Sequence, residues 1–205
     1  MSKMKSLLPL YIFNTVYLVV GGVYFLQDLN HEFVIYVAVI VGLLLVLFGT
    51  LRYTEFPLWL LWLFSVWGLL HVLGGAVETR DGVLFAYRIY PFLDFGGDFF
   101  ILKYDQVVHF YLYGIMALIF RHLLCHTLKV SGSTTFVIFI SLVASLGFSA
   151  LNEIMEFIIA VSLERNGVGG YENAMLDLIF NLAGAVVAVA LYYLFQTRKD
   201  VERET

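Results

Sequence analysis

The chain has 205 residues, of which 61% are hydrophobic and 14% are charged, and its formal net charge is −4. A soluble domain is about 45–50% apolar and about 25% charged, so this composition excludes a soluble enzyme and a disordered chain. The negative charge argues against nucleic acid as a partner, and a single cysteine, Cys125, excludes a disulfide framework and a cysteine-based metal site. The composition therefore predicts an integral membrane protein.

Six stretches with few or no charges are each long enough to cross a bilayer, which takes about 20 apolar residues in a helix. The predicted fold class is all-α, a polytopic membrane protein in which residues 1–205 form a single transmembrane domain. The first stretch is too long for a cleavable signal peptide, and no small-residue cleavage pattern follows it. The expected transmembrane helices lie at about 6–27, 33–52, 57–78, 104–125, 133–162 and 173–196.

The positions of lysine and arginine predict the orientation of these helices, because cytoplasmic loops carry an excess of both. Eight of these residues lie on the side of the termini and four lie on the other side. We therefore expect both termini in the cytoplasm and a multi-pass protein of the plasma or inner membrane. The eight are Lys3, Lys5, Arg52, Arg121, Lys129, Arg198, Lys199 and Arg203, and the four are Arg80, Arg88, Lys103 and Arg165.

The connection at residues 79–103 is long for a membrane protein and rich in aromatic side chains. Loops of this length tend to be functional or disordered, and this composition does not indicate disorder. We expect an amphipathic segment in the outer interface, where the aromatic rings either anchor the chain or form a lid over a site. Its aromatic and acidic residues are Phe85, Tyr87, Tyr90, Phe92, Phe95, Phe99, Phe100, Asp81, Asp94 and Asp98.

Ionisable residues inside a bilayer cost free energy and are therefore usually paired and functional. Counting from the expected helix ends, at a rise of about 1.5 Å per residue, places most of them roughly 5–15 Å from the outer boundary. Four helices would then contribute acids and histidines to one layer, which random scatter would not favour. These residues are His71, Asp105, His109, Glu153, Glu156 and Asp177.

Helical spacing places several of these side chains on common faces. Glu153 and Glu156, one turn apart, would repel each other if both were ionised, so they need a cation, a proton or an arginine nearby. The serine stripe favours close helix packing over a proton path. The sets that share a face are Asp105 with His109, Glu153 with Glu156, Asn173 with Asp177 and Asn181, and Ser141 with Ser145 and Ser149.

Carboxylates and imidazoles that meet in a helix bundle are a familiar way to bind a divalent metal. A mixed set of oxygen and imidazole ligands suits Zn, Mn or Fe. We expect His71 to serve as a sixth ligand or as a proton carrier beside this set. The candidate ligands are Asp105, His109, Glu153, Glu156 and Asp177.

Taken singly, most of these residues also have a structural explanation. A lone histidine such as His71 commonly hydrogen-bonds to a neighbouring membrane helix. Asp105 and Asp177 would each be favoured near a helix N-terminus by the helix dipole. The acid pair at 153 and 156 is the hardest to explain in this way, so the functional interpretation depends most on it.

A second polar cluster lies at the cytoplasmic end of the fourth expected helix. Its members are Arg121, His122, Cys125 and His126. A metal site is one interpretation, but no acid accompanies the cluster in the sequence. A basic cap at the membrane interface is the better prediction.

Several stretches resemble known families of bacterial membrane proteins. YDQVVHFYLYG at 104–114 and NEIMEF at 152–157 resemble the polar helix motifs of VanZ-like and YjdF-like proteins. DLIFNLAGA at 177–185 is similar to the Asp-x3-Asn-x2-Gly-Ala signature of the VanZ-like group, and LLHVLGG at 69–75 is similar to the YjdF-like group. The resemblance implies a place in the cell envelope and names no reaction.

Three functions are compatible with this sequence. The first is a metal-dependent hydrolase or transferase that acts on lipids or lipid-linked substrates, with Glu153 or Glu156 as general base and His109 or His71 as ligand or acid. The second is a non-catalytic accessory or lipid-binding protein. The third, an ion-coupled transporter, is disfavoured because the strong polar positions stop in the outer half, whereas transporter sites usually lie near the midplane.

Overall fold

The computed structural model describes residues 2–80, 82–97, 99–163 and 167–204, with the side chains of 7–80, 82–97, 99–163 and 167–196. Six helices in this part of the chain are long and apolar enough to cross a membrane, which confirms the predicted fold class. Several residues used above for orientation and for the loop lie outside the residues, or outside the side chains, so described. They are Lys3, Lys5, Asp81, Asp98, Arg165, Arg198, Lys199 and Arg203.

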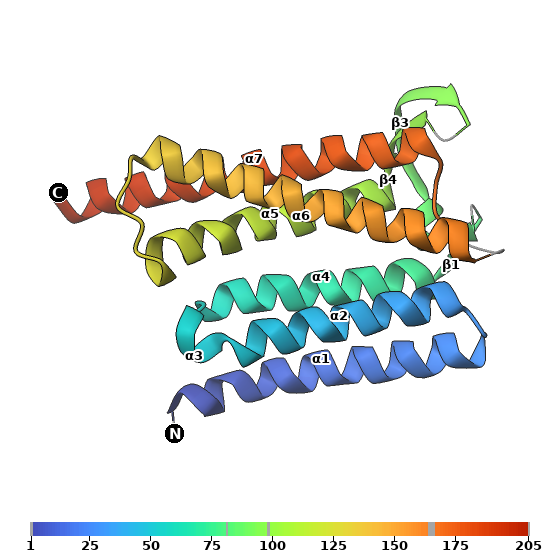
Figure 1. Cartoon of the computed structure of the whole chain (residues 1–205), viewed down its shortest axis with the longest axis horizontal. Helices are drawn as coiled ribbons and strands as arrows, with labels where there is room; N and C mark the ends of the chain where they lie inside the picture. Colours follow the sequence, from blue (N-terminus) through green and yellow to red (C-terminus); the bar gives the residue numbers. More distant parts are fainter. Residues whose placement is uncertain (1, 81, 98, 164–166, 205) are drawn as a thin grey trace.

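The helices form two layers (Figure 1). The first layer contains α1 (Ser2–Gln27), α2 (His31–Gly49), the one-turn α3 (Leu51–Thr54) and α4 (Leu58–Ala76). The second layer contains α5 (Tyr104–His122), its π-helical continuation η2 (Leu123–Thr127), α6 (Thr134–Ser162) and α7 (Tyr171–Glu204). Helices α4 and α5 pack against each other and join the layers. Both termini lie at the same end of the bundle.

Residues 77–80, 82–97 and 99–103 lie at the opposite end, which we call the hairpin end (Figure 1). Two short antiparallel strand pairs and a 3-10 turn, η1, occupy this stretch. They are β1 (Glu78–Thr79), β2 (Gly82–Val83), η1 (Leu84–Ala86), β3 (Arg88–Gly96) and β4 (Phe99–Lys103).

The segment at the hairpin end has two unlike parts. All nine residues of β3 are exposed, and Phe95 is 75% exposed. In contrast, Phe85 packs closely on Gly74 and contacts the rings of both Phe33 and His71. The part around Phe85 therefore covers the end of the bundle, whereas the β3–β4 hairpin does not. A location of the hairpin in the membrane interface stays a prediction.

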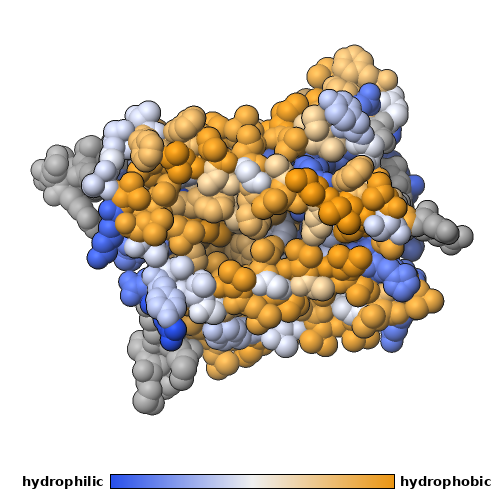
Figure 2. Space-filling view, in the orientation of Figure 1, coloured by the Kyte–Doolittle hydropathy of each residue, from blue (hydrophilic) through white to orange (hydrophobic). Residues whose placement is uncertain are grey.

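The core of the bundle lies around α5, against which α4, α6 and α7 pack. Gly184 of α7 lies so close to α5 that a Cβ atom there would overlap the carbonyl oxygen of Phe110. A Cβ on Gly114 would in turn lie 3.1 Å from the carbonyl oxygen of Gly184. Small residues allow membrane helices to approach in this way. Outward-facing leucine, valine, isoleucine and phenylalanine cover the lipid side of the bundle (Figure 2).

The start of α5 is held in place by Gln106, a fully buried residue. Its side-chain oxygen accepts a hydrogen bond from the backbone nitrogen of Lys103 at 3.0 Å, and its side-chain nitrogen donates to the carbonyl of Phe100 at 2.8 Å. Satisfying an otherwise orphan N–H at a helix N-terminus stabilises the first turn. This contact holds the first turn of α5, the helix that carries Asp105 and His109.

The orientation of the bundle can be tested with the native cysteine as a control. Cys125 is exposed near the end of the bundle that carries the termini, and Glu78 is exposed at the hairpin end. With the termini in the cytoplasm, Glu78→Cys in a Cys125→Ser background should react with a membrane-impermeant maleimide in intact cells. The wild-type chain should react only after permeabilisation. The reverse labelling pattern would invert the predicted topology.

Candidate metal site

The five predicted ligands lie together at the hairpin end. Asp105 and His109 belong to the first turns of α5, the two glutamates to α6 and Asp177 to α7. Their ligand atoms form two groups, each with all atoms within 4.8 Å of one another. His109 belongs to both groups, so it is the centre of the cluster. The groups are Asp105 with His109 and Asp177, and His109 with Glu153 and Glu156.

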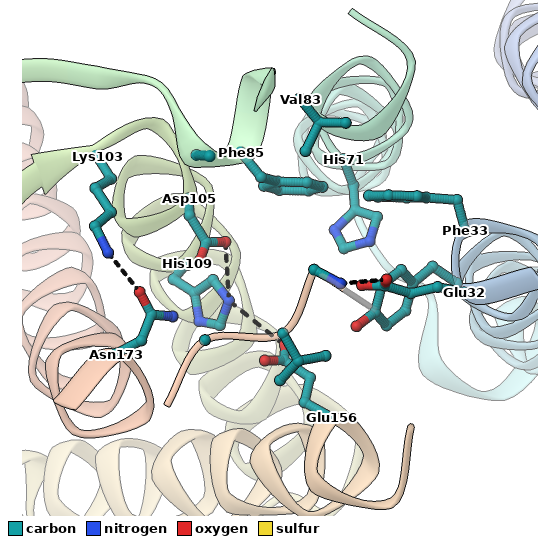
Figure 3. A pocket seen from close by; sticks show the side chains of 15 residues that line it. Glu32, Phe33, His71, Val83, Phe85, Lys103, Asp105, His109, Glu156 and Asn173 are labelled. Carbon is teal, nitrogen blue, oxygen red and sulfur yellow. Dashed lines mark hydrogen bonds and ion pairs between the residues drawn. The ribbon is translucent and has the colours of Figure 1, made fainter. Parts of the chain in front are cut away.

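Three carboxylates surround the ring of His109 at short distances. Its Nε2 lies 3.5 Å from Oδ1 of Asp105 and 3.9 Å from Oε1 of Glu156 (Figure 3). Its Nδ1 lies 3.9 Å from Oε1 of Glu153. Two ligand atoms that are each about 2.1 Å from one zinc ion lie at most about 4.2 Å apart. The two separations from Nε2 are therefore compatible with one ion shared by His109, Asp105 and Glu156.

The orientation of the His109 ring is determined by α7. Nδ1 lies 3.1 Å from the side-chain oxygen of Asn181, whose nitrogen donates to Oγ of Ser149 at 2.6 Å. An oxygen partner places the proton on Nδ1 and leaves the lone pair of Nε2 directed at Asp105 and Glu156. A second partner of this kind is the usual way in which proteins orient a metal-binding histidine.

Buried carboxylate oxygens in this cluster lack partners. Both oxygens of Glu153 and the Oδ1 atom of Asp177 accept no hydrogen bond from the described residues. The other oxygen of Asp177 accepts from the Asn173 amide at 2.6 Å, and Asp177 is fully buried. Buried acceptors without partners are rare in native proteins because they lose their hydration without replacement. They point to a cation or a proton in the cluster.

A cavity of about 230 Å³ opens beside the cluster (Figure 3). Asp105, His109 and Glu156 form its polar wall, and Phe33 and Phe85 contribute apolar surface. The cavity is thus bounded partly by the covering segment of the hairpin end. This arrangement agrees with the lid alternative for residues around Phe85 and does not involve the β3–β4 hairpin.

His71 lines the same cavity but stands apart from the carboxylates. Its ring contacts the rings of Tyr36, Trp67 and Phe85, with centroid distances of 5.4, 5.6 and 5.0 Å. It belongs to neither group of potential ligands among the described residues. The structure therefore places the ring of His71 among aromatic side chains and outside both groups of potential ligands.

Two charged residues at the cavity were not predicted from the sequence. Glu32, in the first turn of α2, is buried and accepts a hydrogen bond from the backbone nitrogen of Gly167 at 2.7 Å. Lys103 donates from Nζ to the side-chain oxygen of Asn173 at 2.9 Å. Both lie at expected helix boundaries, where charged residues are ordinary, so the sequence carried no signal that distinguished them.

The cluster of Arg121, His122, Cys125 and His126 lies at the other end of the bundle. Glu55, the residue that follows α3, lies beside it. Nε2 of His126 lies 3.5 Å from Glu55, and Nε2 of His122 contacts the carbonyl of Thr54 at 2.7 Å. Arg121 lies over the ring of Tyr192 at 3.9 Å. The prediction that no acid accompanies this cluster was wrong. Glu55 is distant in the sequence, and the fold brings it to His126. No group of three potential metal ligands occurs here among the described residues.

The serine stripe of α6 is buried and engaged in helix contacts. Ser141 donates to the carbonyl of Val137 at 2.7 Å, Ser145 donates to the carbonyl of Tyr113 at 2.9 Å, and Ser149 accepts from Asn181. These bonds fit a packing role for the stripe.

Comparisons with known proteins place the chain in one family. No curated protein and no solved structure matches it. A family model matches residues 8–198, a range that includes every residue of the cluster around His109. The chain belongs to the family described as predicted membrane protein, DUF2238.

Proposed function

We propose that the cluster around His109 binds a divalent metal, and that the protein is a metal-dependent hydrolase or transferase. Its substrate would be a membrane lipid or a lipid-linked molecule at the outer face of the plasma or inner membrane. The observation that carries the proposal is the convergence of four carboxylates from three helices on one oriented histidine, with buried oxygens that lack partners.

The charge balance of the cluster supports a bound cation. The acids are Asp105, Glu153, Glu156 and Asp177, and Lys103 lies beside them and donates a hydrogen bond to Asn173. Close carboxylates in a low-dielectric environment need a cation or shared protons to coexist. Oxygen and imidazole donors suit Zn, Mn or Fe.

The proposed roles follow from position. The lone pair of His109 Nε2 and the oxygens of Asp105 and Glu156 would hold the ion, which would activate water or polarise a phosphoryl or acyl group. The buried oxygens of Glu153 accept no hydrogen bond from the described residues, and Glu153 is our candidate general base, with Glu156 as the alternative. His71, across the cavity, would act on the substrate side.

A non-catalytic lipid-binding function is the second candidate. Lys103 favours it, because a lysine on the cavity wall offsets part of the negative charge without a metal. We further propose a relation to the VanZ-like and YjdF-like groups, which rests on the motifs at 104–114, 152–157 and 177–185.

Metal analysis of the purified protein tests the proposal. We expect a stoichiometric amount of Zn, Mn or Fe by elemental mass spectrometry after purification without chelators. Retention should fall as the pH is lowered, because protons compete with the metal for carboxylate and imidazole ligands. Protein that takes up none of the three ions, even after incubation with them at neutral pH, would favour the lipid-binding function.

A further inference from the structure

A second cavity, of about 140 Å³, lies beside the polar one. It lies between α2 and α6, and residues of α4 and α5 line its inner side. Tyr36 and His71 line both cavities, so the two share a wall. Its lining is otherwise mostly apolar, with Ile40, Leu43 and Met155 among the residues.

This apolar cavity reaches from the core to the lipid side of the bundle. Ile40 in its lining is 1% exposed, whereas Leu151 of α6 is 61% exposed. The surface on this face of the bundle is largely hydrophobic (Figure 2). A hydrocarbon chain could therefore enter sideways from the bilayer, between α2 and α6.

Two residues of the lining carry a buried donor atom that lacks a hydrogen-bond partner among the described residues. Trp67 Nε1 and the Tyr113 hydroxyl have no hydrogen-bond partner among the described residues, although these residues are only 4% and 1% exposed. Buried Trp and Tyr usually find a partner for their polar atom. An indole N–H can only donate, so its missing partner is an acceptor atom.

We infer that the apolar cavity binds the carbonyl end of an acyl chain whose polar head lies in the neighbouring cavity. The carbonyl oxygen accepts a hydrogen bond from Trp67 or Tyr113, and the head group reaches the cluster around His109. This inference rests on the proposed function and specifies its substrate class as an acyl lipid. An apolar cavity of about 150 Å³ holds a benzene-sized group, so only the first carbons are enclosed and the rest of the chain lies between α2 and α6 in the bilayer.

Photo-crosslinking of the full-length protein in vesicles tests the position of the chain. The probe is a monoacyl phospholipid with an ester linkage and a diazirine on the chain close to the carbonyl. Leu151→Trp fills the opening and should lower labelling about tenfold, which corresponds to about 1.4 kcal/mol. Ile154→Trp is the matched control, because Ile154 is exposed on the same helix but does not line the cavity. Equal labelling of both variants would overturn the inference.

The chemistry of the linkage is tested with Trp67→Phe and an ether-linked probe. The wild-type protein should label with the ester in preference to the ether by about two- to tenfold, the range of one neutral hydrogen bond. Trp67→Phe should reduce this ratio, and Tyr113→Phe serves as the second variant if Trp67→Phe does not fold. The ratio of two probes on one sample cancels differences in the amount of protein, and circular dichroism on the same sample shows whether the variant is folded. No preference in the wild type would contradict a bound carbonyl.

Metal content measured on the same samples separates this inference from the proposed function. Leu151 is exposed and is not one of the potential ligands, so Leu151→Trp should keep the metal while losing the lipid. Labelling that is unaffected by Leu151→Trp in a protein that holds metal would refute the lipid position alone. Leu151-dependent labelling of a protein that holds no metal would instead refute the metal site and leave the lipid position intact.

Discussion

His109→Ala is expected to abolish metal retention, with a loss of affinity above about 100-fold. His109 belongs to both ligand groups, so its removal leaves the acids of three helices without their shared imidazole. Changes to residues that merely orient a ligand already cost about 10–100-fold. Asn181→Ala, which removes the partner of His109 Nδ1, should therefore fall within that smaller range. Isothermal titration of the metal-free protein measures both.

The matched control for this prediction is His122→Ala at the other end of the bundle. His122 contacts a backbone carbonyl and belongs to no group of potential ligands among the described residues, so metal affinity should not change. Glu153→Gln keeps the size of the side chain and should also weaken metal retention and remove any activity while leaving the helical content unchanged. Unchanged metal affinity in His109→Ala would show that the cluster is not the site.

Gly184→Ala is expected to destabilise the protein by about 1–3 kcal/mol, the usual cost of overpacking. An added methyl group would overlap the backbone oxygen of Phe110, and backbone atoms cannot move aside as a flexible side chain does. To accommodate the methyl group, α7 would have to move away from α5. This movement would lengthen the 3.1 Å contact between His109 and Asn181, so metal affinity should fall as well. Unfolding in detergent, followed by circular dichroism, gives the stability.

Gly147→Ala in α6 is the control, because no atom lies within 4 Å of the position that a Cβ would take. Alanine favours a helix over glycine by about 0.5–1 kcal/mol, so this variant should be as stable as the wild type or slightly more stable. Equal stability of the two alanine variants would mean that α5 and α7 are not packed as closely as the structure has them.

Local sequence was enough to predict the helices, because crossing a bilayer requires long apolar stretches whatever the neighbours are. The confirmed six-helix fold class follows from this single requirement. The candidate ligands could be chosen in the same way. An acid such as Glu153 within an apolar stretch is costly in lipid, and depth along a helix can be counted from the residue number.

Burial at the helix boundaries could not be predicted locally. Glu32 is an ordinary boundary charge in the sequence, and it is buried because the backbone of Gly167, distant along the chain, donates a hydrogen bond to it. Glu55 approaches His126 for the same kind of reason, through α3 and the turn that ends it. Such contacts depend on where loops cross the ends of the bundle, and apolar periodicity carries no information about that.

The sequence by itself determined that the chain spans a membrane with six helices and that Asp105, His109, Glu153, Glu156 and Asp177 lie at similar depth. Only the tertiary structure decided how these residues face one another. Depth along the bilayer is a property of each helix, whereas rotation and neighbours depend on packing between helices. The contact of Gly184 with α5 and the bond from Asn181 orient His109 toward the acids, while His71, at a similar depth, faces aromatic rings instead.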